Sequence, residues 1–464
     1  MQSTNGTGHA SLRPAGALVA AAALLLAMVG ARSYPGGWND ASRLATVESL
    51  VDYQTWAIDR SVFAPLTSDK MFIGGRFYSD KSPVPALAMA GGYKLLQSFT
   101  GLTAREQPAV FCYAMTLATS GLAYVAAAWC LFQLAIALRL SRGDALLLAA
   151  SLSLATIALP YTRHVNNHIL LLGVVAALVL SLERLAQQIR SDGDAHGPLW
   201  PRLIWCGTLA GAGYTIDLGV GPVLLLATVG LVAYRCRSLA SMAAFVVAAV
   251  PWLALHHVLN YAIGGTWTPA SAAPQHFVWP GSPFNPSNMT GGWNHESLPR
   301  GMLYAVAMLL GKRGLVTHSL PLLLALPGFV LLWRRRSRHW PELLFATGLF
   351  GGTWLLYAAA SNNYSGLCCS IRWFVPLLAP GYYVLAVLLA EHPRLRPDFL
   401  VLSAAGGLIG GLMWWHGPWH ARTGAWLWPL VAAALAGWWW AAAKRRRVAI
   451  GPEISCPAAV AAKI

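Results

Sequence analysis

Apolar segments of about 20 residues recur along nearly the whole chain, and this repetition is the strongest limit on its fold. A segment of that length can cross the hydrocarbon core of a bilayer as one α-helix. Charged and Gly/Pro-rich stretches separate the segments, so the pattern predicts an all-α polytopic membrane protein of about 11–13 transmembrane helices. The predicted spans run near residues 15–31, 108–138, 144–160, 168–185, 202–215, 219–234, 239–261, 315–333, 341–359, 373–390, 398–415 and 425–442.

The composition also separates this chain from soluble enzymes. Hydrophobic residues make up 56% of the 464 residues, and charged residues only 11%. Soluble domains carry about 25% charged residues, so a soluble enzyme with one membrane anchor is excluded. We expect a single integral-membrane domain over residues 1–447. Residues 448–464 contain Pro452 and Pro457, and they are predicted to form a short cytoplasmic tail.

The formal net charge of +16 indicates membrane topology rather than nucleic-acid binding. The basic residues form short clusters on alternate turns, as the positive-inside rule expects. We therefore place these turns and both termini in the cytoplasm, with membrane lipids as partners and no nucleic acid. The first span can also be read as a cleavable signal peptide. The basic clusters are Arg139 with Arg142, Arg184 with Arg190 and Arg202, Arg235 with Arg237, Arg334 to Arg338, Arg394 with Arg396, and Lys444 to Arg447.

Two long loops are expected on the external side, over residues 32–107 and 262–300. Within the first loop, residues 84–100 are less apolar than a span, and they suit an interfacial amphipathic helix. A true span at 84–100 is the alternative, and it would invert every later loop. The second loop is longer than the usual dozen residues, which favours a role in function for it.

The first external loop concentrates ionisable residues beside the membrane. Trp38-Asn39-Asp40-Ala41-Ser42-Arg43 follows the first span, and Phe77-Tyr78-Ser79-Asp80-Lys81-Ser82-Pro83 lies about forty residues later. Charged groups next to hydrocarbon cost free energy unless they are paired or hydrated, so such a concentration indicates a functional site.

These two stretches resemble the first external loop of GT-C glycosyltransferases, and most of all the bacterial lipid A aminoarabinose transferases and the protein O-mannosyltransferases. The resemblance implies a multispanning helical fold, a polyprenyl-phosphate-linked sugar donor and a bacterial inner-membrane location. It covers about the first hundred residues in detail. The chain departs from the family pattern at Ala41, where a second acidic residue is usual, and at Ser82, which separates Lys81 from Pro83.

The chemistry of such a reaction assigns roles to two residues of this loop. A sugar linked to a polyprenyl phosphate already has a good leaving group, so the enzyme needs a base for the acceptor hydroxyl and cations for the departing phosphate. Asp40 fits the base and Lys81 the phosphate ligand. The alternative is structural, with Asp40 capping a helix or pairing with Arg43, and with Lys81 in a surface turn. Arg43, Tyr78 and Asp80 are further candidates for substrate contacts.

The turn from Tyr161 to His168 is the next candidate site. Arg163 is expected to bind the donor phosphate, and His164, Asn167 and His168 the substrate, while a capped helix end is the alternative. His164 and His168 are four residues apart, but no third ligand is near them, so we predict no metal there. No cofactor is assigned, and a divalent metal stays open.

Four candidates lie later in the chain. Asp217 separates two short apolar segments, either facing a cavity or satisfying the backbone of a broken helix, and these segments could form a re-entrant pair. Arg372 begins a span from the external side, where it suits a lipid phosphate, with snorkelling as the alternative. Tyr364 and Glu296 are candidate substrate contacts on external loops.

Together these features predict an inverting glycosyltransferase that acts on a lipid, glycan or protein acceptor at the external face. A transporter or flippase of a lipid-linked sugar is the rival from another class, although its ionisable residues should gather near the bilayer midplane. A polysaccharide polymerase or ligase is a second rival, and its chemistry should centre on a late external loop.

Overall fold

The computed structural model describes residues 7–191, 198–285, 288–419 and 426–449. It is an integral membrane protein with a helical bundle, as the apolar segments predict. Within the described residues, six helical segments are long and apolar enough to cross a membrane: Pro108–Ala137, Asn167–Arg190, Leu239–Gly264, Trp340–Ala360, Arg372–Glu391 and Pro393–His416. Shorter apolar helices accompany them at Pro14–Gly30, Val220–Cys236, Leu298–Leu310 and Leu320–Arg334.

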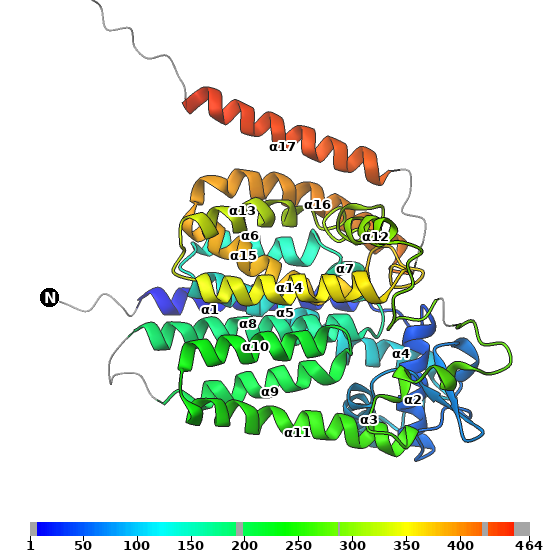
Figure 1. The fold of residues 1–464 in the computed structure, drawn as a ribbon. Helices are drawn as coiled ribbons and strands as arrows, with labels where there is room; N and C mark the ends of the chain where they lie inside the picture. The colour runs from blue at the N-terminus through cyan, green and yellow to red at the C-terminus, as the bar shows by residue number, and fades with distance from the viewer. Residues whose placement is uncertain (1–6, 192–197, 286–287, 420–425, 450–464) are drawn as a thin grey trace, which may run out of the picture.

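The bundle has two different ends (Figure 1). The helices α2 (Trp38–Asp52) and α3 (Pro83–Thr100) lie at one end, with the antiparallel hairpin of β1 (Lys70–Ile73) and β2 (Arg76–Ser79). We call this the loop end. The start of α1 (Thr7–Gly30) and the far end of α17 (Leu427–Ala449) lie at the opposite end, which we call the basic end.

The remaining helices form the body of the bundle. A π-helical turn joins α4 to α5 in one continuous helix. The bounds are α4 Pro108–Thr116, α5 Leu122–Ala137, α6 Arg142–Leu154, α7 Ala158–Tyr161, α8 Asn167–Arg190, α9 Trp200–Ile216, α10 Val220–Cys236, α11 Leu239–Gly264, α12 Leu298–Leu310, α13 Ala325–Arg334, α14 Trp340–Ala360, α15 Leu378–Glu391 and α16 Arg396–His416.

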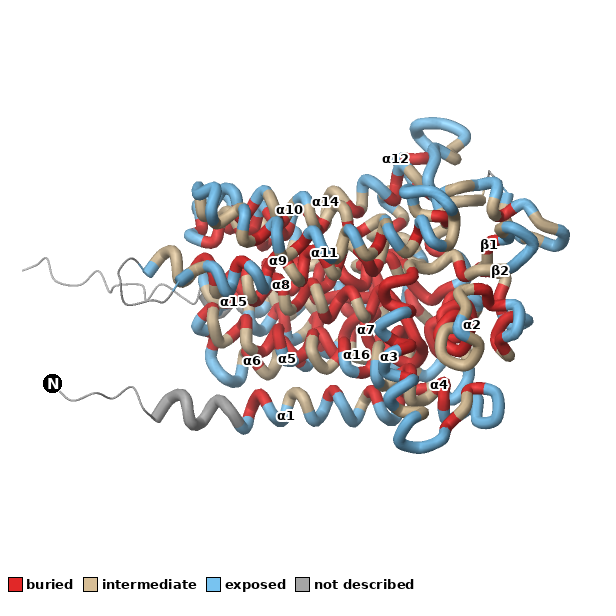
Figure 2. The backbone as a smooth tube through the Cα atoms, turned by 90° about the horizontal axis from the view of Figure 1, so that it is seen from below, coloured by how far each residue is buried: buried red, intermediate tan, exposed pale blue. Residues whose placement is uncertain are grey.

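Burial divides the bundle into central and peripheral helices (Figure 2). The segment Arg372–Glu391 is 94% buried inside the protein, whereas Leu239–Gly264 is only 17% buried. The apolar surface of α11 is thus left for lipid, and α15 forms part of the core. Glycines permit close helix contacts in the bundle: a Cβ on Gly207 would collide with the carbonyl oxygen of Phe245, so the backbones of α9 and α11 touch there.

Helix boundaries differ from the predicted spans at several places. The predicted span 373–390 begins with a 3-10 segment, Arg372–Leu377, before α15. The predicted span 144–160 is broken after Leu154, because Pro160 has no N–H to continue the helical ladder. The predicted span 315–333 begins with a 3-10 turn, Leu320–Leu324, before α13. Between the late loop and this turn lies α12, which sequence analysis missed because its apolar stretch is shorter than a full span.

The two short helices around Asp217 run along the bundle with the other helices (Figure 1). Each has 17 residues, a length of about 26 Å at 1.5 Å per residue. At the loop end, α3 is a helix beside α2, and it is not among the segments long and apolar enough to span. Its position agrees with the predicted interfacial helix. The predicted tail, residues 448–464, lies almost wholly outside the described residues.

Candidate functional site

Asp40 lies in the first turn of α2 and is fully buried at the loop end. Its Oδ2 accepts hydrogen bonds from the backbone N–H groups of Gly36 (2.6 Å) and Gly37 (3.2 Å). Asp40 therefore caps the helix, as the structural alternative predicts, but this uses one oxygen only. Its Oδ1 is buried and has no hydrogen-bond partner. Burial raises the pKa of Asp40 to about 7, although the two amides and the charge of Arg372 oppose the rise.

Two ring systems enclose the Asp40 carboxylate. The imidazole Nδ1 of His164 lies 3.4 Å from Oδ2 of Asp40, and the indole of Trp419 lies with its centroid 6.2 Å from that of His164. Gly36 lets the backbone approach both rings, because a Cβ there would lie 2.5 Å from His164 Cε1 and 2.4 Å from Trp419 Cδ1. Sequence analysis missed Trp419, although its position just after the predicted span 398–415 was a usable signal.

Lys81 is held between two carboxylates. Its Nζ lies 2.7 Å from Oδ2 of Asp69 and 2.8 Å from Oδ2 of Asp80. Burial acts to raise the pKa of Asp69, but Lys81 outweighs it and holds that pKa below its usual range. Burial raises the pKa of Asp80, against the opposing charge of Lys81. An ammonium has three N–H donors, so one remains after these two contacts.

Asp69 was not among the predicted site residues. The hairpin register pairs Lys70 with Ser79, which places Asp69 and Asp80 next to each other at the open end of the hairpin. A Gly74-Gly75 turn, equally far from both aspartates, was the signal for this pairing.

Asp217 forms a second polar cluster between α9 and α10. Its carboxylate accepts hydrogen bonds from the Asn167 amide (3.0 Å) and the Tyr357 hydroxyl (3.1 Å). It also accepts from the backbone N–H groups of Gly219 and Val220, both at 3.0 Å. Asp217 thus satisfies the break between the two helices. Nδ1 of His168 lies 3.3 Å from the same carboxylate and has no hydrogen-bond partner.

Two arginines connect these clusters. Arg43 is buried, and its charge interacts with those of Asp80, Asp217 and Asp69. Burial lowers the pKa of Arg43 to about 10, so it stays charged at neutral pH. The guanidinium carbon of Arg372 lies 5.3 Å from the centroid of the Trp419 ring. Among the described residues Arg372 has no ion-pair partner, and its buried Nε has no hydrogen-bond partner.

Four predicted site residues lie apart from these clusters. The Glu296 side chain is 87% exposed and approaches Arg300. Arg163 donates a hydrogen bond to the carbonyl of Trp414 and lies over its ring. Tyr364 packs on Tyr304 with ring centroids 4.6 Å apart. Tyr78 lies in β2 and packs against the small apolar cluster of Met71, Ala270 and Phe277.

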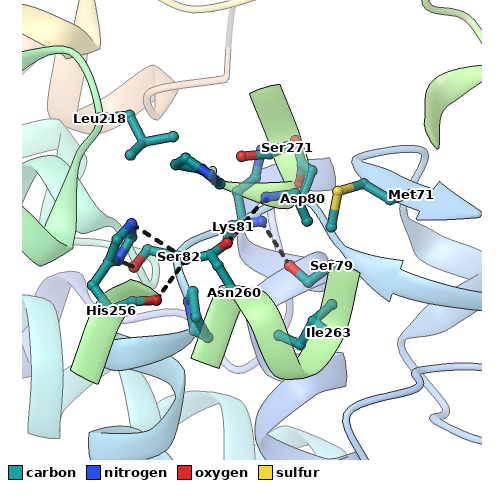
Figure 3. Close-up of a pocket in the computed structure, with 13 residues that line it drawn as sticks. Met71, Ser79, Asp80, Lys81, Ser82, Leu218, His256, Asn260, Ile263 and Ser271 are labelled. Carbon is teal, nitrogen blue, oxygen red and sulfur yellow. Dashed lines mark hydrogen bonds and ion pairs between the residues drawn. The ribbon is translucent and has the colours of Figure 1, made fainter. Parts of the chain in front are cut away.

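A pocket opens beside Lys81 (Figure 3). Its polar lining includes side chains from the first loop and from α11, which sequence analysis did not connect. Oγ of Ser82 lies 3.4 Å from Nδ1 of His256. Its lining residues also include Ser79, Asp80, Asn260 and Ser271.

Buried polar atoms without partners gather at the loop end. Buried polar groups in proteins are nearly always hydrogen-bonded, so such a concentration indicates a site for a polar ligand. The atoms are Asp40 Oδ1, Asp80 Oδ1, His164 Nδ1, Asn167 Oδ1, His168 Nδ1, Arg372 Nε and Trp419 Nε1.

A metal centre is not built from these residues. His164 approaches Asp40 while His168 approaches Asp217, so the two imidazoles serve different carboxylates. Within the described ranges, one group of three side chains could hold a metal ion: Glu183, His339 and Glu342. Glu342 already accepts two hydrogen bonds from Arg235, and Glu183 accepts from Arg190 and Tyr383. This group is a satisfied ion-pair network.

Comparison with known proteins gives a likeness of fold. No known family model matches the chain, and no curated protein matches its sequence. The structure is similar to the crystal structure of ArnT from Cupriavidus metallidurans bound to undecaprenyl phosphate, with a TM-score of 0.51 and 15% identity over 91% of this chain and 74% of that one. It is similar to apo ArnT with a TM-score of 0.51 and 17% identity, over 84% of this chain and 62% of the other. The chain therefore shares a multispanning helical membrane fold with ArnT, which confirms the fold predicted from the sequence.

Proposed function

We propose that this protein is a membrane glycosyltransferase that transfers a sugar from a polyprenyl-phosphate donor to an acceptor hydroxyl. The ArnT-like fold supports a GT-C type transferase, and the undecaprenyl phosphate bound in one ArnT structure supports a lipid phosphate as partner. The acceptor is a lipid, a glycan or a protein. The proposal places the reaction at the loop end of the bundle.

The observation that carries this proposal is a buried carboxylate oxygen without a partner, near a half-buried arginine that has no ion-pair partner among the described residues. Oδ1 of Asp40 and Nε of Arg372 both lack partners, and the charge of Arg372 is near enough to lower the pKa of Asp40. A transfer from a sugar phosphate needs a proton acceptor and a cation for the leaving phosphate. The two groups supply these two needs.

The reaction follows from this pairing as a single displacement. Oδ1 of Asp40 takes the proton of the acceptor hydroxyl while the acceptor oxygen forms a bond to the anomeric carbon of the sugar. The bond from that carbon to the phosphate oxygen breaks, and the phosphate leaves with the electron pair. Attack opposite the leaving group inverts the configuration at the anomeric carbon. Burial strengthens the base, because little water competes for the Asp40 carboxylate.

The phosphate is assigned first to Arg372. Lys81 is a second ligand through its remaining N–H, although Asp69 and Asp80 already offset its charge. Arg163 was predicted as a third ligand, and reaching the phosphate would require its guanidinium to leave the Trp414 carbonyl. We therefore expect a smaller effect from changing Arg163 than from changing Arg372.

Sugar and acceptor contacts are assigned to the polar groups around these cations. Unpartnered atoms of Asp80, Asn167 and His168 can each take a hydrogen bond from a ligand. Arg43 and Asp217 are expected to hold these groups in place through their charges. Tyr78, Tyr364 and Glu296 lie apart from these groups. They would contact the substrate only if the segments that carry them moved toward it.

Transfer of labelled sugar tests the proposal. Membranes containing the wild type, supplied with polyprenyl-phosphate sugars, should label an acceptor. Asp40→Asn should lower the rate by at least about 100-fold, and Arg372→Gln should raise KM for the donor as well as lower kcat. Glu106→Gln is the matched control. Glu106 is an exposed carboxylate of the same loop, and among the described residues its side chain accepts a hydrogen bond from Thr103 alone.

Other results would point to the rival functions. Full activity of Asp40→Asn would remove this carboxylate as the base. If no donor gives transfer and the protein instead moves lipid-linked sugar between vesicle leaflets, it is a flippase. Products that grow by many repeat units would identify a polymerase.

A further inference from the structure

Trp419 adjoins both groups that the proposed reaction uses. Its pyrrole ring packs on Gly36 and Gly37, the residues whose amides hold Asp40. A Cβ on Gly36 would collide with Cδ1 of the indole, and one on Gly37 would lie 3.4 Å from Cδ2. The guanidinium carbon of Arg372 lies 5.3 Å from the centroid of the same indole, a cation–π contact that holds the guanidinium beside the ring.

Backbone contacts fix the segment that carries Trp419. The chain leaves α16 through Gly417, whose φ of 86° favours glycine. The carbonyl of Pro418 then accepts a hydrogen bond from the backbone N–H of Cys369 at 2.8 Å. Cys369 lies three residues before Arg372, so this bond joins the segment of the indole to the segment of the guanidinium.

Two buried donors at this place have no acceptor. Nε1 of Trp419 and Nε of Arg372 are both buried, and neither has a hydrogen-bond partner among the described residues. Both nitrogens can only donate. Buried polar atoms are nearly always hydrogen-bonded, so the pair indicates a ligand that supplies acceptor oxygens to both.

A phosphate fits these two donors better than a sugar hydroxyl does. A hydroxyl brings a single oxygen and a proton of its own, whereas a phosphate brings several acceptor oxygens. The guanidinium also carries a positive charge, and a charged donor binds an anion more tightly than a neutral group. The two donors therefore point to an anionic group with more than one oxygen.

We propose that Trp419 binds the leaving phosphate together with Arg372, through its indole N–H. The inference rests on the proposed function, in which Arg372 takes that phosphate. No proton is transferred, because the indole keeps its N–H and only donates a hydrogen bond to a phosphate oxygen. The indole ring also keeps the guanidinium of Arg372 in place.

This contact strengthens as the reaction proceeds. The donor is a phosphodiester with one negative charge, and the product polyprenyl phosphate is a monoester with up to about two at neutral pH. When the bond from the anomeric carbon to the phosphate oxygen breaks, charge gathers on that oxygen. An interaction that grows toward the transition state lowers the barrier, so Trp419 should affect kcat more than KM for the donor.

Binding of undecaprenyl phosphate tests the inference without sugar or acceptor. The whole chain in lipid nanodiscs is titrated with this lipid and with undecaprenol, which lacks the phosphate, and binding is followed by native mass spectrometry. Trp419→Phe keeps an aromatic ring for Arg372 but removes the N–H, so it should raise Kd for undecaprenyl phosphate at least about tenfold. Kd for undecaprenol should stay unchanged. Trp419→His restores a ring N–H and should recover part of the affinity.

Trp415→Phe is the matched control. Trp415 lies four residues before Trp419 and is 75% exposed, so its variant should bind undecaprenyl phosphate as the wild type does. Equal melting temperatures establish that the variants are folded. If Trp419→Phe is unfolded, Trp419→His decides in its place, and a tenfold loss of affinity there would overturn the proposal.

The outcomes separate this inference from the proposed function. Wild-type affinity in Trp419→Phe would overturn the role of the N–H and leave Arg372 as the phosphate ligand. If the wild type binds undecaprenyl phosphate no more tightly than undecaprenol, the proposed function itself fails. In the transfer assay Trp419→Phe should lower kcat about tenfold, and a change of KM alone would contradict a contact that strengthens in the transition state.

Discussion

At the scale of single residues, the burial of Asp40 has a cost for stability. Its pKa in the folded protein is about 7, well above the ordinary value of 3.8. The folded state therefore holds the proton more tightly than the unfolded chain does. Between pH 4 and pH 7 the unfolded chain loses its proton first, so stability falls as the pH rises through this window and then stays at the lower level.

Asp40→Asn is thus expected to stabilise the protein at alkaline pH. The amide carries no charge, so its burial does not become more costly as the pH rises. At pH 8 the gain should be on the order of a few kcal/mol, and at pH 4 it should vanish. Thermal unfolding of both proteins in the same detergent at the two pH values measures this. A variant that is less stable than the wild type at pH 8 would contradict the assigned burial cost.

The two glycines that cap Asp40 should respond differently to alanine. At Gly36 the new Cβ would meet the rings of His164 and Trp419 at about 2.5 Å, whereas at Gly37 the nearest atom of another residue, in Trp419, is 3.4 Å away. Gly36→Ala should therefore displace the rings from Asp40 and lower transfer at least about tenfold. Gly37→Ala should change it little. Initial rates of transfer, measured at matched membrane expression, compare the two variants. Equal losses of rate in both would speak against this packing.

Site residues within the first external loop were predictable from the sequence, and site residues from distant elements were not. Asp40 and Lys81 stand out because charged groups follow a membrane span. Asp69 needs the hairpin register before its contact with Lys81 can be seen. Trp419 follows α16, and Tyr357 and His256 lie on α14 and α11. Only packing brings Trp419 and His256 to the first loop and Tyr357 to Asp217.

At the scale of elements, long spans were easier to predict than short helices. The apolar length of α8 or α11 exceeds what a bilayer requires, so these helices are evident from composition. The shorter α12 and the broken pair α6 and α7 are stabilised by their neighbours. Ser319 illustrates this, since its hydroxyl accepts a hydrogen bond from the backbone N–H of Ile157 within the break.

Contact between α9 and α11 depends on Gly207 and Gly211, one turn apart. A Cβ on Gly211 would lie 2.7 Å from the carbonyl oxygen of Ala249, and a Cβ on Gly207 would lie closer still to Phe245. In membranes, helices are held by packing of small residues rather than by a hydrophobic driving force. Gly207→Leu should therefore separate the two helices and lower the thermal stability by several degrees.

Gly230→Leu on the neighbouring α10 provides the control, since no atom lies within 4 Å of its Cβ position. Thermal unfolding reports the separation of the helices. It is followed by the fluorescence of a thiol dye that reacts with newly exposed cysteines, such as the buried Cys206 on α9. Equal melting temperatures for Gly207→Leu and Gly230→Leu would refute the role of the glycine contact.

At the scale of the whole molecule, charge separates the two ends of the bundle. Ion pairs at the basic end link α8 and α10 to α14: Glu342 on α14 lies 2.6 Å from Arg235 on α10 and 3.7 Å from Arg190 on α8. The loop end instead keeps unpartnered polar atoms. A satisfied network favours rigidity, and an unsatisfied one favours ligand binding. This division fits the proposed function, in which the basic end holds the bundle together and the loop end binds the substrates.

The positive-inside rule then predicts which end faces the cytoplasm, and two exposed glycines allow a direct test. Gly143 lies in the first turn of α6 at the basic end, and Gly292 lies in the loop before α12. Each is replaced by cysteine, and intact cells are treated with a maleimide that cannot cross the membrane. Gly292→Cys should react in intact cells, whereas Gly143→Cys should react only after the membrane is opened. The native cysteines are mostly buried, so the wild type sets a low background. The opposite pattern would place the loop end in the cytoplasm, where the acceptor hydroxyl would have to be a cytoplasmic one.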